Sequence, residues 1–346
     1  MEFSGGTALP DGNQCVVERN MSKRDLEAEY LTIRRRSTQV RQRTRRGDEY
    51  VQRLIDTGEV TRDEAAGMRS LDPGYNRMLR HFSSEAEAAI RDRWSFDETV
   101  FVGEIITGEV NANVHRARNG FIVLINDGLL LFAHQICVLA GLSCDPAARN
   151  AARVTELARC VEETVLAYVE RGDSTYAHRP DYPLGRIGNV VATVRNVCEM
   201  FVVAHEYGHI LGGHLDRANT RALPGSPDVK VIEKNWSEEF EADEYGANIM
   251  SQWGTKSGHH PKAVIGGCMF ALFLLLAIDR IRAKRDGVPF EDPGSESHPP
   301  VLNRIERLGD HFATLTSAEL VGASNVFGTQ LLMLTDEICG ETLNVR

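Results

Sequence analysis

The apolar positions of the chain recur mainly with helical spacing, and in one region with the spacing of strands. Between residues 99 and 126, β-branched and other apolar residues gather in the segments Thr-Val-Phe-Val and Phe-Ile-Val-Leu-Ile, which predicts two or three strands. Helical periods begin near Asp127 and continue over about 146–172, 187–215, 236–253 and 261–284. We therefore expect an α+β fold, mainly α, in which a small sheet precedes a helical body.

The order of these segments predicts four parts. Glycine, proline and asparagine without periodicity predict a flexible tail over residues 1–22, and a highly charged helical pattern predicts a helical N-terminal appendage over 23–95. The main domain is expected over 96–315, with a helical insertion at about 145–190. A C-terminal helical segment is expected over 316–346.

Composition is typical of a globular cytoplasmic protein without a membrane span. Seven cysteines, an odd number scattered through apolar stretches, favour buried reduced thiols over a disulfide framework. The longest uncharged apolar stretch, 263–278, falls short of the roughly 20 residues needed to cross a bilayer, and we interpret it as a core helix. The N-terminus lacks the positively charged and apolar regions of a secretory signal.

The net charge of −10 argues against a protein that binds nucleic acid mainly by electrostatics, because such binding needs a cationic surface that displaces counterions. One local exception is the segment 34–46, which carries seven arginines and no acid. A solvated helix face or a mobile arm is the favoured interpretation of this segment. Docking of nucleic acid or of an acidic partner is the alternative.

Candidate chemistry begins at residues 205–209, which read His-Glu-Tyr-Gly-His at the end of an apolar helical run. Positions i and i+4 of a helix face the same way, so His205 and His209 can reach one metal ion. Zinc suits two imidazoles and a carboxylate, with a fourth position left for water. Glu206 follows the first histidine directly and is the expected general base. Spaced histidines on a surface helix remain the alternative for this pattern alone.

A third ligand is therefore required. The metzincin pattern would place a histidine six residues after His209, but that position is Leu215, and His214 is out of register by one. About thirty residues downstream, Glu239 and Asp243 stand at i and i+4 of a predicted acidic helix. One of them can ligate the metal while the other supports a ligating histidine, and Glu241 is expected to be solvated. A simple solvated helix face is the alternative.

With these motifs the chain resembles the gluzincin zinc peptidases of the CAAX prenyl protease and HtpX type. In that family an ExxAD helix with a nearby glycine follows HExxH, and an Asn-Ala segment, a strand and Gly-Leu-Leu precede it, while a His-Pro…Arg-Ile segment comes after. The residues that match the ExxAD helix are Glu239, Ala242, Asp243 and Gly246. Those that match the preceding segments are Asn111, Ala112 and 128–130, and those that match the later segment are His298, Pro299, Arg304 and Ile305.

The resemblance covers roughly residues 99–310 and implies a zincin-like fold. It implies one zinc ion per chain, held by His205, His209 and Glu239, with Asp243 as a supporting residue. It also implies that an extended substrate pairs with an edge strand near 121–126. His298 and Arg304 become candidates to stabilise the oxyanion, with helix-start packing and a structural salt bridge as their alternatives. For His298, a fourth metal ligand in a resting state is a further alternative. The membrane helices of well-known relatives are absent from this sequence.

Three functions are weighed. The leading expectation is a zinc-dependent endopeptidase that cleaves a cytosolic protein or peptide through a metal-activated water. A regulatory, phage-defence or toxin-type protease that docks through the segment 34–46 is the second, on analogy alone. A non-catalytic scaffold stabilised by metal is the third, and Glu206 argues against it because a structural zinc site needs no general base.

Overall fold

The computed structural model describes residues 23–34, 52, 74–105, 112–126, 128–146, 150–171, 174, 177–178, 180, 185–217, 220–223, 226–232, 235–292, 294, 298–340 and 343. The predicted tail at 1–22 lies outside these residues, and so does the basic segment 34–46 apart from Arg34. The docking role weighed for that segment therefore stays a prediction.

A helix over residues 23–34 comes first among the described elements. Those after it are α4 (Gly74–Arg91), β1 (Val100–Ile105), β2 (Ala112–Ala117), β3 (Gly120–Asn126), α5 (Leu129–Cys144), α6 (Ala151–Arg171), a 3-10 turn η3 (Gly185–Ile187), α7 (Gly188–Leu211), α8 (His214–Arg217), β4 (Thr220–Leu223), β5 (Ser226–Ile232), α9 (Trp236–Lys256), α10 (Pro261–Asp286), α11 (Val301–Leu315), α12 (Ala318–Gly322) and α13 (Val326–Cys339). The predicted α+β class, mainly helical with a small sheet, is confirmed.

The main elements lie where apolar periodicity predicts them, and the largest omission is a hairpin. Strands β4 and β5 pair antiparallel where the sequence predicts only a Pro/Gly loop at 223–228. Strand β4 has only four residues, and the Pro-Gly-Ser-Pro sequence at 224–227, which overlaps the start of β5, is typical of a turn. The predicted helix at 187–215 is interrupted after Leu211 by Gly212 and Gly213, and Gly213 has a φ of +64°.

The order of strands in the three-stranded sheet is β1-β3-β2, with β3 parallel to β1 and antiparallel to β2. The prediction of an edge strand near 121–126 is therefore wrong, because that segment is β3, the central strand. Six of its seven residues are buried. A strand with apolar residues on both faces gains most burial in the middle of a sheet, which leaves β1 and β2 as the edges.

Helices cover both faces of this sheet. Val123 of β3 packs into the main core, whereas Ile122 and Leu124 pack into a second cluster with the helix of residues 23–34. In that helix, the hydroxyl of Tyr30 donates to the carbonyl oxygen of Glu104 at 2.7 Å. The sheet is thus the middle layer between the helical body and this N-terminal helix.

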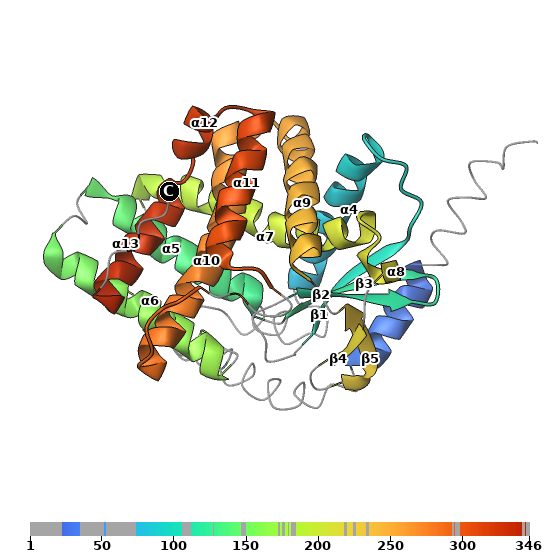
Figure 1. Ribbon diagram of the computed structural model, residues 1–346, viewed down its shortest axis with the longest axis horizontal. Coiled ribbons are helices and arrows are strands. Elements are labelled where there is room, and N and C mark those ends of the chain that lie inside the picture. The colour runs from blue at the N-terminus through green and yellow to red at the C-terminus, as the bar shows by residue number, and fades with distance from the viewer. Residues whose placement is uncertain are drawn as a thin grey trace, which may run out of the picture.

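The second half of the predicted N-terminal appendage belongs to the main core. In α4, Leu79, Ala86 and Ile90 are fully buried within the core cluster. The hydroxyls of Ser83 and Tyr207 lie 2.8 Å apart, which links α4 to α7 by a buried hydrogen bond. In Figure 1, α4 lies beside α9 and close to the end of α7.

The helical body is organised around α10, with α7, α11 and α13 packed against it (Figure 1). Among the described residues, α10 is the one helix long and apolar enough to cross a membrane, but 89% of its apolar window is buried inside the protein. The six described cysteines are free thiols, and burial raises the pKa of Cys198 and Cys268 well above the usual value.

Candidate metal centre

The centre is built where α7 and α9 cross at close range. A side chain at Gly208 would place its Cβ 2.6 Å from the carbonyl oxygen of Ala242, and one at Gly246 would lie 3.3 Å from the backbone of His205. Small residues at 208, 242 and 246 therefore let the two backbones approach. This approach brings the donors of α9 against the histidines of α7.

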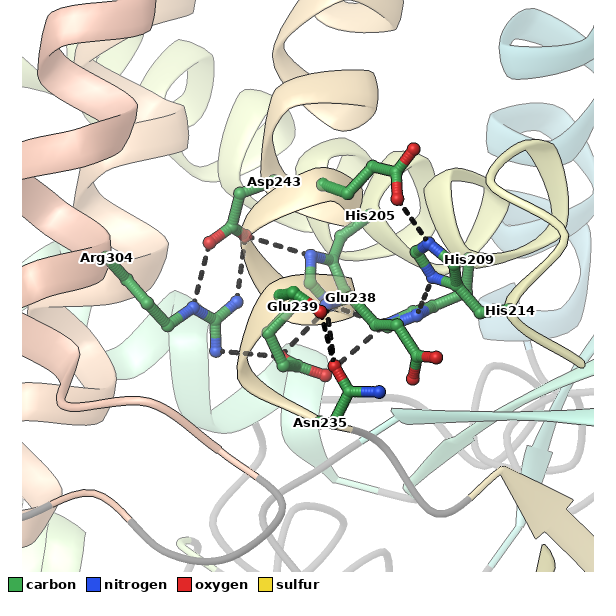
Figure 2. A network of polar contacts seen from close by, with 10 residues as sticks. His205, His209, His214, Asn235, Glu238, Glu239, Asp243 and Arg304 are labelled. Atoms are coloured by element: carbon green, nitrogen blue, oxygen red, sulfur yellow. Dashed lines mark hydrogen bonds and ion pairs between the residues drawn. The ribbon is translucent and has the colours of Figure 1, made fainter. Parts of the chain in front are cut away.

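The histidine and glutamate donors converge on one point. The Nε2 atoms of His205 and His209 lie 3.2 Å apart. Oxygen atoms of Glu239 lie 3.3 Å from Nε2 of His209 and 3.6 Å from Nε2 of His205. Glu239 is 1% exposed and His209 is 0% exposed. Figure 2 shows Glu239 reaching from α9 toward the two imidazoles.

Glu206 adds a second carboxylate, and it can be grouped with His205 and His209 as a possible metal-holding set whose ligand atoms all lie within 4.8 Å of one another. Two carboxylates therefore compete for the third ligand position. Glu239 contacts both Nε2 atoms directly, which favours Glu239 as the ligand. Glu206 lies beside the cluster and lines the adjoining cavity, the position that a general base requires.

Asp243 and Arg304 hold His205 and Glu239 in position by hydrogen bonds and ion pairs. The Nδ1–H of His205 donates to Oδ1 of Asp243 at 2.9 Å, which directs Nε2 toward the centre. Arg304 donates from Nε and Nη2 to both Asp243 oxygens at 2.8 Å, and its Nη1 lies 3.1 Å from Glu239. Burial alone would raise the pKa of Asp243, but Arg304 and His205 outweigh it and lower that pKa.

The contacts of Arg304 change its expected role. The sequence suggests donation to an oxyanion, but Nε, Nη1 and Nη2 of Arg304 all face Asp243 or Glu239, and the side chain is 6% exposed. A guanidinium used in this way holds the carboxylates in place. His298 remains a candidate, since it lines the same cavity as Glu206 and is half-buried.

A second chain of hydrogen bonds supports His209, and the sequence did not lead us to expect it. Nδ1 of His209 lies 2.9 Å from Nδ1 of His214, and Nε2 of His214 lies 3.0 Å from Oε2 of Glu241. If Nε2 of His209 faces a metal, its Nδ1–H donates to His214, whose Nε2–H then donates to Glu241. The expectation that Glu241 is merely solvated is therefore wrong, although its side chain is 43% exposed.

Two glycines make the contact between His209 and His214 possible. The positive φ of Gly213 reverses the chain after α7, and a Cβ on Gly212 would lie 2.3 Å from the imidazole of His214. Only a residue without a side chain leaves room for His214 to fold back onto His209. The Gly-Gly-His sequence that begins three residues after His209 is the signal that could have revealed this contact.

The first turn of α9 is fixed by its cap. The side chain of Asn235 accepts a hydrogen bond from the backbone N–H of Glu238 at 3.1 Å. Glu238 and Glu239 then stand at the positive end of the helix dipole, where a carboxylate is favoured. The cap therefore sets the start of α9, and with it the side on which Glu239 and Asp243 lie.

A cavity of about 790 Å³ opens beside the centre. His205, Glu206, Glu239, His298 and Arg304 all belong to its wall. Its other walls come from β2, α5, α7, α10 and the segment between α10 and α11. The site can therefore receive a ligand much larger than water.

Comparison with protein-family models, with curated proteins and with solved structures gives no match to this chain.

Proposed function

We propose that the protein is a zinc-dependent metalloendopeptidase of the gluzincin type with a zincin-like fold. His205, His209 and Glu239 hold the metal, and Glu206 is the general base. The observation that carries this proposal is the convergence of two Nε2 atoms, 3.2 Å apart, on the Glu239 carboxylate, whose Oε1 lies 3.3 Å from Nε2 of His209 and whose Oε2 lies 3.6 Å from Nε2 of His205.

The spacing of these donors is compatible with zinc. Donors about 2.0–2.1 Å from a tetrahedral ion stand about 3.4 Å from one another, and the separation of the two Nε2 atoms and the distance from each to its nearer Glu239 oxygen lie close to this value. Two imidazoles and one carboxylate also form the donor set of catalytic rather than structural zinc sites. Such a set leaves the fourth position open toward the cavity.

When bound, zinc supplies a Lewis acid that polarises the scissile carbonyl and lowers the pKa of a water molecule to about 7. The carboxylate of Glu206 accepts the proton of the attacking water and passes it to the nitrogen of the leaving amine. Asp243 keeps Nε2 of His205 directed at the centre, and His214 does the same for His209. His298 is our candidate donor to the oxyanion.

The substrate is proposed to be an extended peptide of a protein. Strand β2 is an edge of the sheet, and its first residue, Ala112, belongs to the cavity wall. An extended chain paired with β2 would therefore pass the centre, which moves the expected β-augmentation from β3 to β2. A non-catalytic scaffold explains less, because a structural zinc site closes its four positions with protein ligands and needs no cavity.

The test combines metal content with peptide cleavage. We expect about one zinc per chain in the wild type by elemental analysis and cleavage of unstructured protein substrates such as casein. Glu206→Gln should retain zinc and lose at least about 100-fold in kcat, because it removes the base but no ligand. Glu239→Ala should lose both zinc and activity, and Glu244→Gln, which alters a partly exposed carboxylate of the same helix that pairs with Arg307, should lose neither.

Zinc retained by Glu239→Ala would assign the third ligand to another residue. Zinc-loaded wild type that cleaves nothing would overturn the peptidase proposal.

A further inference from the structure

The cavity contains a buried carboxylate that the proposed metal chemistry does not use. Glu199 lies on α7 and belongs to the cavity wall together with Val202 and Glu206. These residues are spaced three and four apart, so they share one face of the helix. Glu199 is 2% exposed, although it borders a large open cavity.

Glu199 has little internal compensation for its charge. Its nearest cation is Arg195, whose Nε lies 3.8 Å from Oε1, too long for a hydrogen bond. Its Oε2 is buried and has no hydrogen-bond partner among the described residues. Burial raises the pKa of Glu199 to about 7, against a smaller opposing effect of Arg195. A buried carboxylate without a hydrogen-bond partner destabilises the folded state unless a ligand supplies the missing partner.

The surroundings indicate which ligand would do so. Much of the cavity wall is apolar, with Leu130 and Ala133 from α5 and Leu275 from α10. Apart from the metal centre, the charged residues lining the cavity are one base and four acids, namely Arg282, Glu199, Asp279, Glu291 and Asp292. An apolar passage with an excess of negative charge favours a long aliphatic stem that ends in a cation.

The distance along α7 also suits a long side chain. Glu199 precedes His205 by six residues, which corresponds to about 9 Å along the helix axis. A four-carbon lysine stem followed by a hydrogen bond of about 3 Å covers this distance. A short side chain beside the scissile bond would not reach Glu199.

We propose that Glu199 forms a specificity subsite for a lysine or arginine side chain next to the bond that is cleaved. This inference rests on the proposed peptidase function and names the class of substrate. Glu199 contributes to substrate recognition and takes no part in the bond-breaking step.

The experiment compares three alanine- and glycine-based decapeptides whose single central residue is lysine, norleucine or glutamate. Norleucine has the same aliphatic stem as lysine and lacks the cation. We expect zinc-loaded wild type to have a kcat/KM for the lysine peptide at least about tenfold above that for norleucine, with glutamate poorest. Mass spectrometry of the products locates the cleaved bond beside the central residue.

Glu199→Gln removes the charge at nearly constant volume. We expect it to lower the ratio of kcat/KM between lysine and norleucine peptides by about ten- to hundredfold. Glu244→Gln, on α9 and outside the cavity wall, should keep the wild-type ratio. Equal kcat/KM for lysine and norleucine in the wild type, or an unchanged ratio in Glu199→Gln, would overturn the subsite.

Binding separates this inference from the peptidase proposal. The same peptides are titrated calorimetrically into Glu206→Gln and into the double variant Glu199→Gln/Glu206→Gln, neither of which needs to cleave them. Tighter binding of the lysine peptide that disappears in the double variant supports the subsite even if the wild type cleaves nothing. Equal binding of lysine and norleucine peptides to Glu206→Gln would reject it even if the wild type is an active peptidase.

Discussion

His214 shows how a residue outside the ligand set can govern the metal. It is fully buried between His209 and Glu241, and it holds Nδ1 of His209 so that Nε2 faces the other donors. We expect His214→Ala to lower zinc affinity by about 10–100-fold, because an unsupported imidazole loses its orientation and basicity. Competition with a chromophoric chelator measures this affinity.

The control for this prediction is His178→Ala, which removes an exposed imidazole. Cobalt substitution adds a spectroscopic readout, since a rotated His209 would change the absorption of the bound cobalt. Wild-type zinc affinity and an unchanged cobalt spectrum in His214→Ala would reduce His214 to a packing residue.

Glu199 makes a second prediction at the residue scale, through pH. Its folded-state pKa of about 7 lies above the usual 4.5, so its contribution to stability is fully present below pH 4.5 and is lost as pH rises through about 7. The charged or titratable groups that interact with it are Arg195 and Cys198 on its own helix and Cys137 from α5.

Glu199→Gln removes this titration. We expect the stability of the variant relative to wild type to rise by about 2 kcal/mol between pH 5.5 and pH 8. Urea unfolding at the two pH values measures the difference. A stability difference that does not change with pH would mean that the carboxyl group is ionised throughout this range.

At the scale of elements, the crossing of α7 and α9 depends on Gly208. An alanine there would place its Cβ 2.6 Å from the carbonyl oxygen of Ala242, so the helices must separate. We expect Gly208→Ala to cost about 1–3 kcal/mol and to weaken zinc binding, because Glu239 moves away from the histidines. Thermal unfolding and zinc titration give the two measurements.

Gly309 provides the matched control, since it also lies within a helix but its added Cβ would meet only ordinary contacts at 3.8 and 3.9 Å. Gly309→Ala should preserve zinc affinity and leave stability equal or slightly higher. If Gly208→Ala binds zinc as tightly as Gly309→Ala, the close approach of the two helices is not what sets the site.

At the scale of the whole molecule, we expect the metal to link separate helices and so to stabilise the fold. Its proposed ligands lie on α7 and α9, and Arg304 of α11 adds a cation that contacts Glu239. Without zinc, Glu206 and Glu239 are two buried acids in the wall of the same cavity, and both are 1% exposed. Removing the metal should therefore destabilise the folded state.

We expect a chelator such as EDTA to lower the Tm of the wild type by several degrees, and added zinc to restore it. Glu239→Ala, which lacks a ligand, should show little response to either treatment. A wild-type Tm that EDTA leaves unchanged, with zinc shown to be removed, would separate metal binding from global stability.

Local patterns predicted much of the fold. Apolar periodicity predicted two or three strands within 99–126, where the structure has three, and located the helices that became α6, α9 and α10. It failed for β4 and β5, where the sequence indicates only a loop. The family resemblance misplaced β3 at an edge, because the position of a strand in a sheet depends on pairing with other strands and not on its own pattern. The sequence pattern also separated the first 95 residues from the main domain, whereas α4 packs in the main core.

The sequence by itself determined the possible donors, because the spacing of His205 and His209, and of Glu239 and Asp243, follows from helix geometry within one element. Only the tertiary structure decided how they are used. It brought Glu239 to the histidines, engaged Arg304 with the carboxylates, joined His214 to Glu241 and left Glu199 at the cavity. These contacts depend on how separate helices pack against one another. The periodicity of one helix shows which of its faces is buried, but it does not show which side chains of other helices lie there.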